Sequence, residues 1–88
     1  MELLEGLPSP EELMEFERTY IMPCVKKVAP VVLVEGKGAT LKDAYGKEYI
    51  DLFSGVATVN VGHCHPKVVK AVCEQASKLI HTTTLYYT

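Results

Sequence analysis

The sequence predicts an α+β fold: an N-terminal helix, a three-stranded antiparallel β-meander and then a second helix. Apolar residues recur at helical spacing near both ends of the chain, whereas the period changes to two from residue 31 onward. Glycine-containing turn sequences divide this middle part into three short segments rich in β-branched and aromatic residues. Because a lone three-stranded sheet is only marginally stable in water, we expect other structure to cover its apolar face.

The first helix has a well-marked start. Ser9 is a suitable N-cap, Pro10 fits the first turn, and Glu12 completes a capping box. Pro23 is expected to end this helix, and residues 1–8 are expected to form a flexible leader. The apolar stripe of the helix consists of Leu13, Phe16, Tyr20 and Ile21.

Three segments are expected to be strands: "VVLVE" (31–35), "ATLKD" (39–43) and "KEYIDLF" (47–53). Residues 36–38 and 44–46 separate them and supply glycine for tight hairpins. The stretch "EGKGAT" lacks the spacing of a phosphate-binding loop and has strands on both sides, so it is expected to be a hairpin.

A loop over residues 54–62 and a helix from Pro66 to about Ile80 are expected to follow the third strand. Glu74 and Lys78 stand at the favourable i, i+4 spacing on the solvated side of this helix. Its opposite side is expected to be a buried stripe made of Val69, Val72, Cys73, Ala76, Leu79 and Ile80.

Length and charge exclude several kinds of function. A chain of 88 residues fits one small domain and has little room for a large enclosed active site. The net charge of −2 and the lack of a basic stripe argue against nucleic acid, and no apolar run reaches the roughly 20 residues that span a bilayer. The odd number of cysteines, 3, favours reduced thiols in a cytoplasmic compartment, and the acidic start is unlike a targeting leader.

The stretch "GHCHP" at residues 62–66 has two interpretations. His63, Cys64 and His65 are metal-ligating residue types, so the chain is an alternative candidate for a small metal-binding or interaction module. Their adjacency differs from the usual ligand spacing, and a second pair of ligands is lacking. The favoured interpretation is a bend in which Gly62 gives backbone freedom and Pro66 starts the helix.

A nucleophile triad of Ser54, His63 and Asp51 is not supported, because Leu52 and Val56 stand where a nucleophile elbow needs glycines. Ser54 is expected to belong to a polar turn at a strand end. Six of the eight lysines are expected on hairpins, strand faces or the solvated side of a helix, and the other two, Lys26 and Lys27, in a connector. The composition gives no reason to expect among them the desolvated amine that an imine requires. From spacing alone, no catalytic residue is expected.

Several linked motifs nevertheless resemble the N-terminal region of class III (ω-type) aminotransferases, which use pyridoxal 5'-phosphate. The densest parts are "GKGATLKDAYGKEYIDLFSG" and "VGHCHPKVVKAV", and the similarity covers residues 31–88 closely and 9–30 more loosely. "FSGVATVNVGHCHP" and "HTTTLYY" look nearest to the alanine-glyoxylate aminotransferase-2-like branch. The acetylornithine and 4-aminobutyrate branches stay open as alternatives.

The resemblance implies that residues 9–88 are a fragment of the small domain of a fold-type I aminotransferase. In that family the imine-forming lysine, the acidic partner of the pyridine nitrogen and the phosphate-binding loop belong to the large domain, which is absent here. The parent would transfer an amino group between an amino acid or ω-amine and a 2-oxo acid. This chain alone is therefore expected to be inactive and to bind no cofactor, and its missing partners are the large domain and a second subunit of a homodimer.

One residue is assigned a role by the resemblance. Val56 in "SGVAT" matches a family position that faces the substrate side chain, so it is the expected substrate-binding residue. An apolar side chain there would leave room for substrate and offer no charge to a distal carboxylate. The alternative interpretation is a small residue that fills a packed loop.

Overall fold

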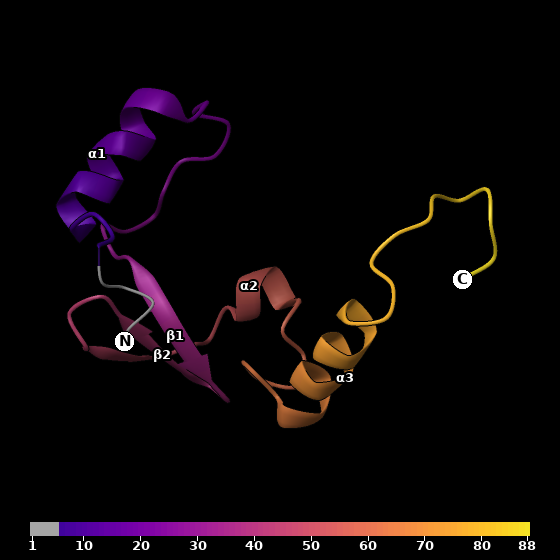
Figure 1. Cartoon of the computed structure of the whole chain (residues 1–88). Helices are drawn as coiled ribbons and strands as arrows, with labels where there is room; N and C mark the ends of the chain where they lie inside the picture. The colour runs from indigo at the N-terminus through magenta and orange to yellow at the C-terminus, as the bar shows by residue number, and fades with distance from the viewer. Residues whose placement is uncertain (1–5) are drawn as a thin grey trace.

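The computed structural model describes residues 6–88, and the first five residues of the expected leader lie outside the described part. The predicted order of a helix, a three-stranded antiparallel sheet and a second long helix is confirmed (Figure 1). An additional short turn, α2, lies between the sheet and the last helix. The elements are α1 (Pro10–Tyr20), β1 (Leu33–Lys37), β2 (Thr40–Asp43), β3 (Glu48–Ile50), α2 (Ser54–Ala57) and α3 (Pro66–Ala76).

Helix α1 begins as its sequence predicts. The Glu12 backbone N–H donates to Ser9 Oγ (3.2 Å) and the Ser9 backbone N–H donates to a Glu12 carboxylate oxygen (2.8 Å), which completes the capping box. Pro10 occupies the first turn, where its missing N–H is harmless. The helix ends at Tyr20, because Ile21 is already extended, ahead of Pro23.

The strands pair in the order β1-β2-β3, and both pairs are antiparallel. The first strand starts later than expected, at Leu33, and continues through Gly36 and Lys37 to a tip at Gly38, whose φ is +59°. The third strand ends at Ile50 instead of reaching residue 53. It ends there because the Asp51 carboxylate binds the next backbone N–H groups and turns the chain away from the sheet.

The second hairpin is held by Asp43, which is only 7% exposed. One Asp43 carboxylate oxygen accepts from the N–H groups of Tyr45 and Lys47 (both 2.9 Å), and the other accepts from the Tyr49 hydroxyl (2.9 Å). Desolvation alone would raise the pKa of Asp43, but these hydrogen bonds and the Lys47 charge outweigh it and lower the pKa. This turn is therefore fixed by its own polar contacts.

The region after the sheet departs from the prediction in two ways. Residues 54–57, expected in a loop, form the single helical turn α2 with left-handed backbone angles. Helix α3 ends at Ala76 and not at Ile80. Ser77 caps it with its hydroxyl on the Cys73 carbonyl (2.8 Å), and the Lys78 N–H then bonds to the Gln75 carbonyl three residues back (3.0 Å) instead of four.

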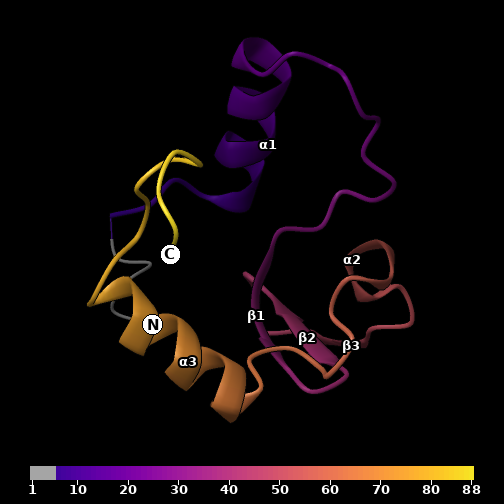
Figure 2. The same ribbon diagram turned by 90° about the vertical axis from the view of Figure 1, so that its right-hand side faces the viewer.

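The apolar residues have no core to enter. No hydrophobic residue of the described chain is buried, and the expected burial of the α3 stripe is wrong for this chain: Val69 is 44% exposed, Val72 61% and Ile80 87%. The physical reason is that the strands pack on one another, whereas no other element of the described chain packs on α3. Figures 1 and 2 show that α1 and α3 stand apart from each other.

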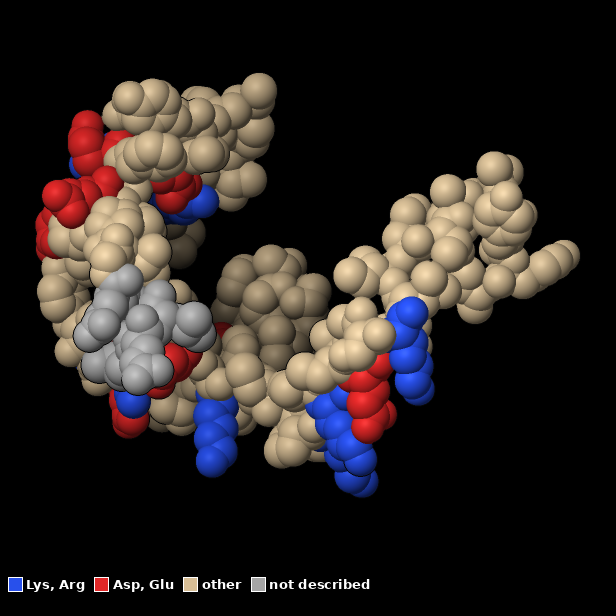
Figure 3. Space-filling model, in the orientation of Figure 1, with Lys and Arg blue, Asp and Glu red and all other residues tan. Residues whose placement is uncertain are grey.

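The size of the molecule agrees with this open arrangement. The accessible surface is 8312 Å², against about 5100 Å² expected for a compact monomer of 9.7 kDa. The radius of gyration is 16.5 Å, against about 12 Å for a compact domain of this length. In Figure 3 the surface is hollowed between the α1 side and the α3 side, and most charged side chains lie on the outer edge. None of the helices in the described residues is long and apolar enough to cross a membrane.

Candidate functional site

The candidate site is built around Asp51, at the point where the chain leaves the sheet. The Asp51 backbone N–H donates to the Ala39 carbonyl (2.8 Å), which anchors this residue beside the start of β2. Its carboxylate oxygen Oδ1 accepts from the backbone N–H groups of Phe53 (2.8 Å) and Ser54 (2.9 Å). Asp51 therefore braces the chain directly before α2, as aspartates commonly do in turns.

The other carboxylate oxygen of Asp51 contacts His63. His63 Nε2 lies 2.5 Å from Asp51 Oδ2, and the side chains are 21% (His63) and 7% (Asp51) exposed. The hydrogen bond with His63, followed by those from the Ser54 and Phe53 backbones, lowers the pKa of Asp51 to about 2. Asp51 is therefore ionised throughout the physiological range.

His63 is fixed by its backbone as well as its ring. Its N–H and C=O pair with the C=O and N–H of Gly38 at the tip of the first hairpin (2.9 and 3.0 Å). The ring side of His63 lies so close to Gly36 that a Cβ on Gly36 would come within 2.9 Å of His63 Cβ and Cγ. Glycine at position 36 is thus required for His63 to sit against the sheet.

The structure brings Asp51 and His63 together, but it does not build the nucleophile triad. Ser54 gives its backbone N–H to Asp51, and His63 binds the same carboxylate. An activated serine would instead need the histidine between its hydroxyl and the carboxylate. The arrangement is a braced turn, in agreement with the expected polar turn at the strand end.

Turn α2 carries Val56. Ser54, Gly55, Val56 and Ala57 have φ values of +55°, +58°, +61° and +59°, so four consecutive residues adopt the left-handed conformation. This conformation costs roughly 1–2 kcal/mol for each residue with a side chain, and for a β-branched valine it is an outlier. Val56 is 71% exposed, so its side chain is presented to the surroundings of this chain.

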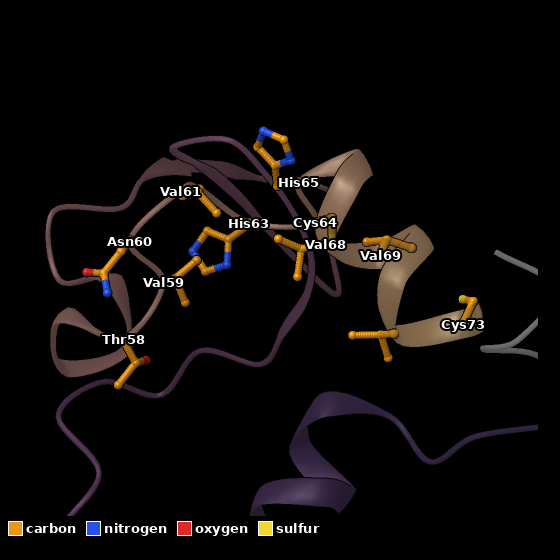
Figure 4. A pocket seen from close by; sticks show the side chains of 12 residues that line it. Thr58, Val59, Asn60, Val61, His63, Cys64, His65, Val68, Val69 and Cys73 are labelled. Atoms are coloured by element: carbon orange, nitrogen blue, oxygen red, sulfur yellow. The ribbon is translucent and has the colours of Figure 1, made fainter. Parts of the chain in front are cut away.

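A groove of about 410 Å³ lies between the segment after α2 and the start of α3 (Figure 4). Val59 and Val61 contribute from the segment, and Val68, Val69 and Val72 contribute from the helix, so the lining is mainly apolar. The ring of His63 stands at its wall. Such a groove can accept apolar side chains of another polypeptide segment.

The expected metal ligands point in different directions. The ring of His63 faces the groove, whereas the His65 ring points away from it (Figure 4). His65 Nδ1 accepts from the Lys67 backbone N–H (3.2 Å) and caps α3, and Cys64 is exposed. Within residues 6–88 there is no group of three histidine, cysteine or acidic side chains arranged to hold a metal. The bend interpretation of this stretch describes the structure, and the metal-module alternative gains no support.

Sequence reasoning grouped Asp51 with His63 only in the rejected nucleophile triad, and it missed their direct pairing as a brace. The two residues are 12 positions apart, and no local pattern links them. The available signal was glycine: Gly36 and Gly62 are the positions where a Cβ would come within about 3 Å of His63 and of the Gly38 backbone. Glycines in strands often mark a close approach of another chain segment.

Comparison with known proteins places these features in a family. The sequence profile described as "Aminotransferase class-III" matches residues 21–88. The acetylornithine aminotransferase of Methanothermobacter thermautotrophicus is 51% identical over 78 residues, which cover 89% of this chain and 20% of that protein. The acetylornithine aminotransferase of Methanopyrus kandleri is 57% identical over 58 residues, which cover 66% of this chain and 15% of that protein.

Solved structures agree with the sequence matches. The acetylornithine aminotransferase from Elizabethkingia anophelis superposes with a TM-score of 0.85 at 40% identity, covering 92% of this chain and 21% of that one. The ornithine aminotransferase from Toxoplasma gondii gives a TM-score of 0.82 at 36% identity, covering 96% and 20%. The chain thus spans about a fifth of the length of these relatives. A fold shared with these enzymes, together with a profile match over residues 21–88, shows that the chain belongs to the class III aminotransferase family.

Proposed function

We propose that this chain acts as the N-terminal segment of the small domain of a pyridoxal 5'-phosphate-dependent aminotransferase. The observation that carries the proposal is the match over residues 21–88 to a family whose members are about five times longer. The parent reaction would transfer an amino group from an amino acid or ω-amine to a 2-oxo acid. The names of the relatives favour ornithine or its N-acetyl derivative as the amino donor.

Val56 is the proposed substrate-facing residue. Its position at an exposed left-handed turn supports this role, because a side chain held there is free to contact a bound molecule. Its isopropyl group offers apolar contact and no charge. It would therefore suit the methylene chain of an ornithine-like donor and leave recognition of a distal carboxylate to other residues.

The described residues do not by themselves fit pyridoxal phosphate. The groove is lined by valines, cysteines, histidines and small polar residues, with no lysine for an imine and no arginine for a phosphate. Lys27, Lys42 and Lys70 lie in surface ion pairs with glutamates, at 2.8, 3.5 and 3.7 Å. We therefore assign the cofactor to the parent enzyme and propose that this chain alone is inactive.

The proposed partners are the large domain and a second subunit of a homodimer. The surface excess of about 3200 Å² over a compact monomer supports this, because it exceeds the roughly 800 Å² that one partner buries in a standard protein interface. The apolar groove beside α3 offers a place for such contacts. Three exposed free thiols, at Cys24, Cys64 and Cys73, support a reducing location such as the cytoplasm.

A complementation assay tests the proposal. The Methanothermobacter relative would be produced without the segment that matches this chain, and the two polypeptides would be expressed together with pyridoxal phosphate. We expect transamination of acetylornithine with 2-oxoglutarate from the pair and none from either part alone. Activity of the 88-residue chain alone, or no activity from a soluble, assembled pair, would contradict the proposal.

A further inference from the structure

We propose that Asp51 and His63 are positioning residues of the aminotransferase site: their contact fixes turn α2 to the β-sheet and so sets the place of Val56. This inference rests on the proposed function, in which Val56 faces the substrate. It adds a pair of residues, distant from each other in sequence, on which substrate recognition by Val56 would depend.

Turn α2 needs outside support because its backbone is strained. Four successive residues are left-handed, and two of them, Val56 and Ala57, have side chains ill-suited to this conformation. Such strain persists only where the surroundings hold it, and it occurs preferentially at functional sites. The support must therefore come from contacts on either side of the turn.

Asp51 supports the turn from its N-terminal side. Its Oδ1 accepts the N–H groups of Phe53 and Ser54 at 2.8 and 2.9 Å, so the chain enters the turn in a fixed direction. On the other side, Thr58 Oγ1 donates to the Gly55 carbonyl at 2.7 Å and closes the turn. Asp51 is the member of this arrangement that reaches beyond the turn.

His63 links Asp51 to the hairpin. Its Nε2 lies 2.5 Å from Asp51 Oδ2, and its backbone forms two hydrogen bonds with Gly38. Because Gly36 has no side chain, His63 can lie against β1 at a place where a Cβ would come within 2.9 Å of it. A continuous series of short contacts therefore runs from the sheet through His63 and Asp51 to the turn.

The exposed fractions of Asp51 and Val56 fit different roles, with Asp51 as a positioning residue and Val56 as the residue that contacts substrate. The Asp51 side chain is 7% exposed, whereas Val56 is 71% exposed. A low pKa keeps Asp51 ionised near neutral pH, so its carboxylate oxygens are available as hydrogen-bond acceptors. The pair is shielded and the valine is presented, as expected if Asp51 and His63 act through Val56.

The test uses the complete aminotransferase, which is this chain assembled with the shortened Methanothermobacter relative of the complementation assay. The values of kcat and KM are measured for the amino donor. Asp51→Ala removes the brace. Two milder single variants, Asp51→Asn and His63→Gln, serve if the alanine variant fails to fold. The matched control is Asp43→Ala, because Asp43 braces the other turn through the same kind of contacts but does not touch the α2 region. We expect KM to rise about tenfold in Asp51→Ala and less than twofold in Asp43→Ala.

A double-mutant cycle with Val56→Ala identifies the route of the effect. If Asp51 acts through Val56, Asp51→Ala should raise KM much less when Val56 is already alanine. Equal KM changes in the Asp51 and Asp43 variants, or fully additive effects with Val56→Ala, would overturn the inference. Failure of the wild-type complete enzyme to transaminate would instead overturn the proposed function, so the two outcomes are distinguishable.

Discussion

Charged substitutions on the apolar face of α3 should have different effects on the chain alone and on the complete enzyme. Val69 and Val72 lie on this face and line the groove, with 44% and 61% of their surface exposed. The charged side chains of the helix lie on another side, toward the lower edge of the molecule in Figure 3. If the rest of the aminotransferase covers the apolar face, charged residues introduced there should destabilise the complete enzyme. In the isolated chain the same charges should reduce association between copies of the chain.

The magnitude follows from the exposed fractions. Together the two valines expose about the surface of one complete valine side chain, whose burial is worth about 1.5–3 kcal/mol. Val69→Glu with Val72→Glu removes this contribution and adds the desolvation of two carboxylates where they are covered. We therefore expect the complete enzyme to lose at least about 2 kcal/mol of stability.

The assay compares this double variant with Lys67→Gln and Lys78→Gln, a control that changes the net charge equally, from −2 to −4. Thermal unfolding of the complete enzyme should show a clearly lower Tm only for the glutamate variant. Sedimentation velocity of the 88-residue chain should show less self-association for the glutamate variant than for the control. An unchanged Tm for the glutamate variant, or equal self-association of both variants, would refute the reasoning that this face is a contact surface.

Two further predictions concern the contacts that organise the sheet and the turn. Asp43 and Asp51 are the only aspartates in the sequence, so carboxyl-labelled aspartate gives two NMR titrations. The Asp51 midpoint should lie near pH 2 and move toward the ordinary 3.8 in His63→Gln, and an unmoved midpoint would contradict the pairing. Because the folded pKa is lowered, the stabilisation is complete above about pH 4 and is lost as the pH falls toward 2. Gly36→Ala should cost about 1–3 kcal/mol by overpacking, mainly against His63 (2.9 Å) and also against Leu41 Cδ2 (3.0 Å), measured by thermal unfolding of the complete enzyme. The cost of Gly36→Ala should shrink in a protein that also carries His63→Gly. The control is Gly46→Ala, where the added Cβ meets no atom within 4 Å and the cost comes only from the φ of +85°. The cost of Gly46→Ala should be the same with and without His63→Gly.

The local elements of this fold could be predicted from sequence because their causes are local. The capping box at Ser9 and Glu12 involves residues three positions apart, and the structure forms it as expected. The period of two and the turn glycines located the three strands, with errors of at most three residues at their ends. The third strand was predicted too long because the bond from Asp51 to the following backbone is not visible in a hydrophobicity pattern.

The candidate site was less predictable, because it depends on contacts between distant segments. Glycines at positions 36 and 62 were the sole sequence signal for the contact between Asp51 and His63, and no pattern predicted four left-handed residues at Ser54–Ala57. Likewise, the apolar spacing of α3 predicted a buried face, whereas this face is exposed because no other element of the described chain packs on it. Sequence alone thus determined the type and order of the elements, since these follow from near-neighbour spacing. Tertiary structure alone decided which side chains meet and which faces stay open, since these depend on where the sheet and its turns carry each segment in space.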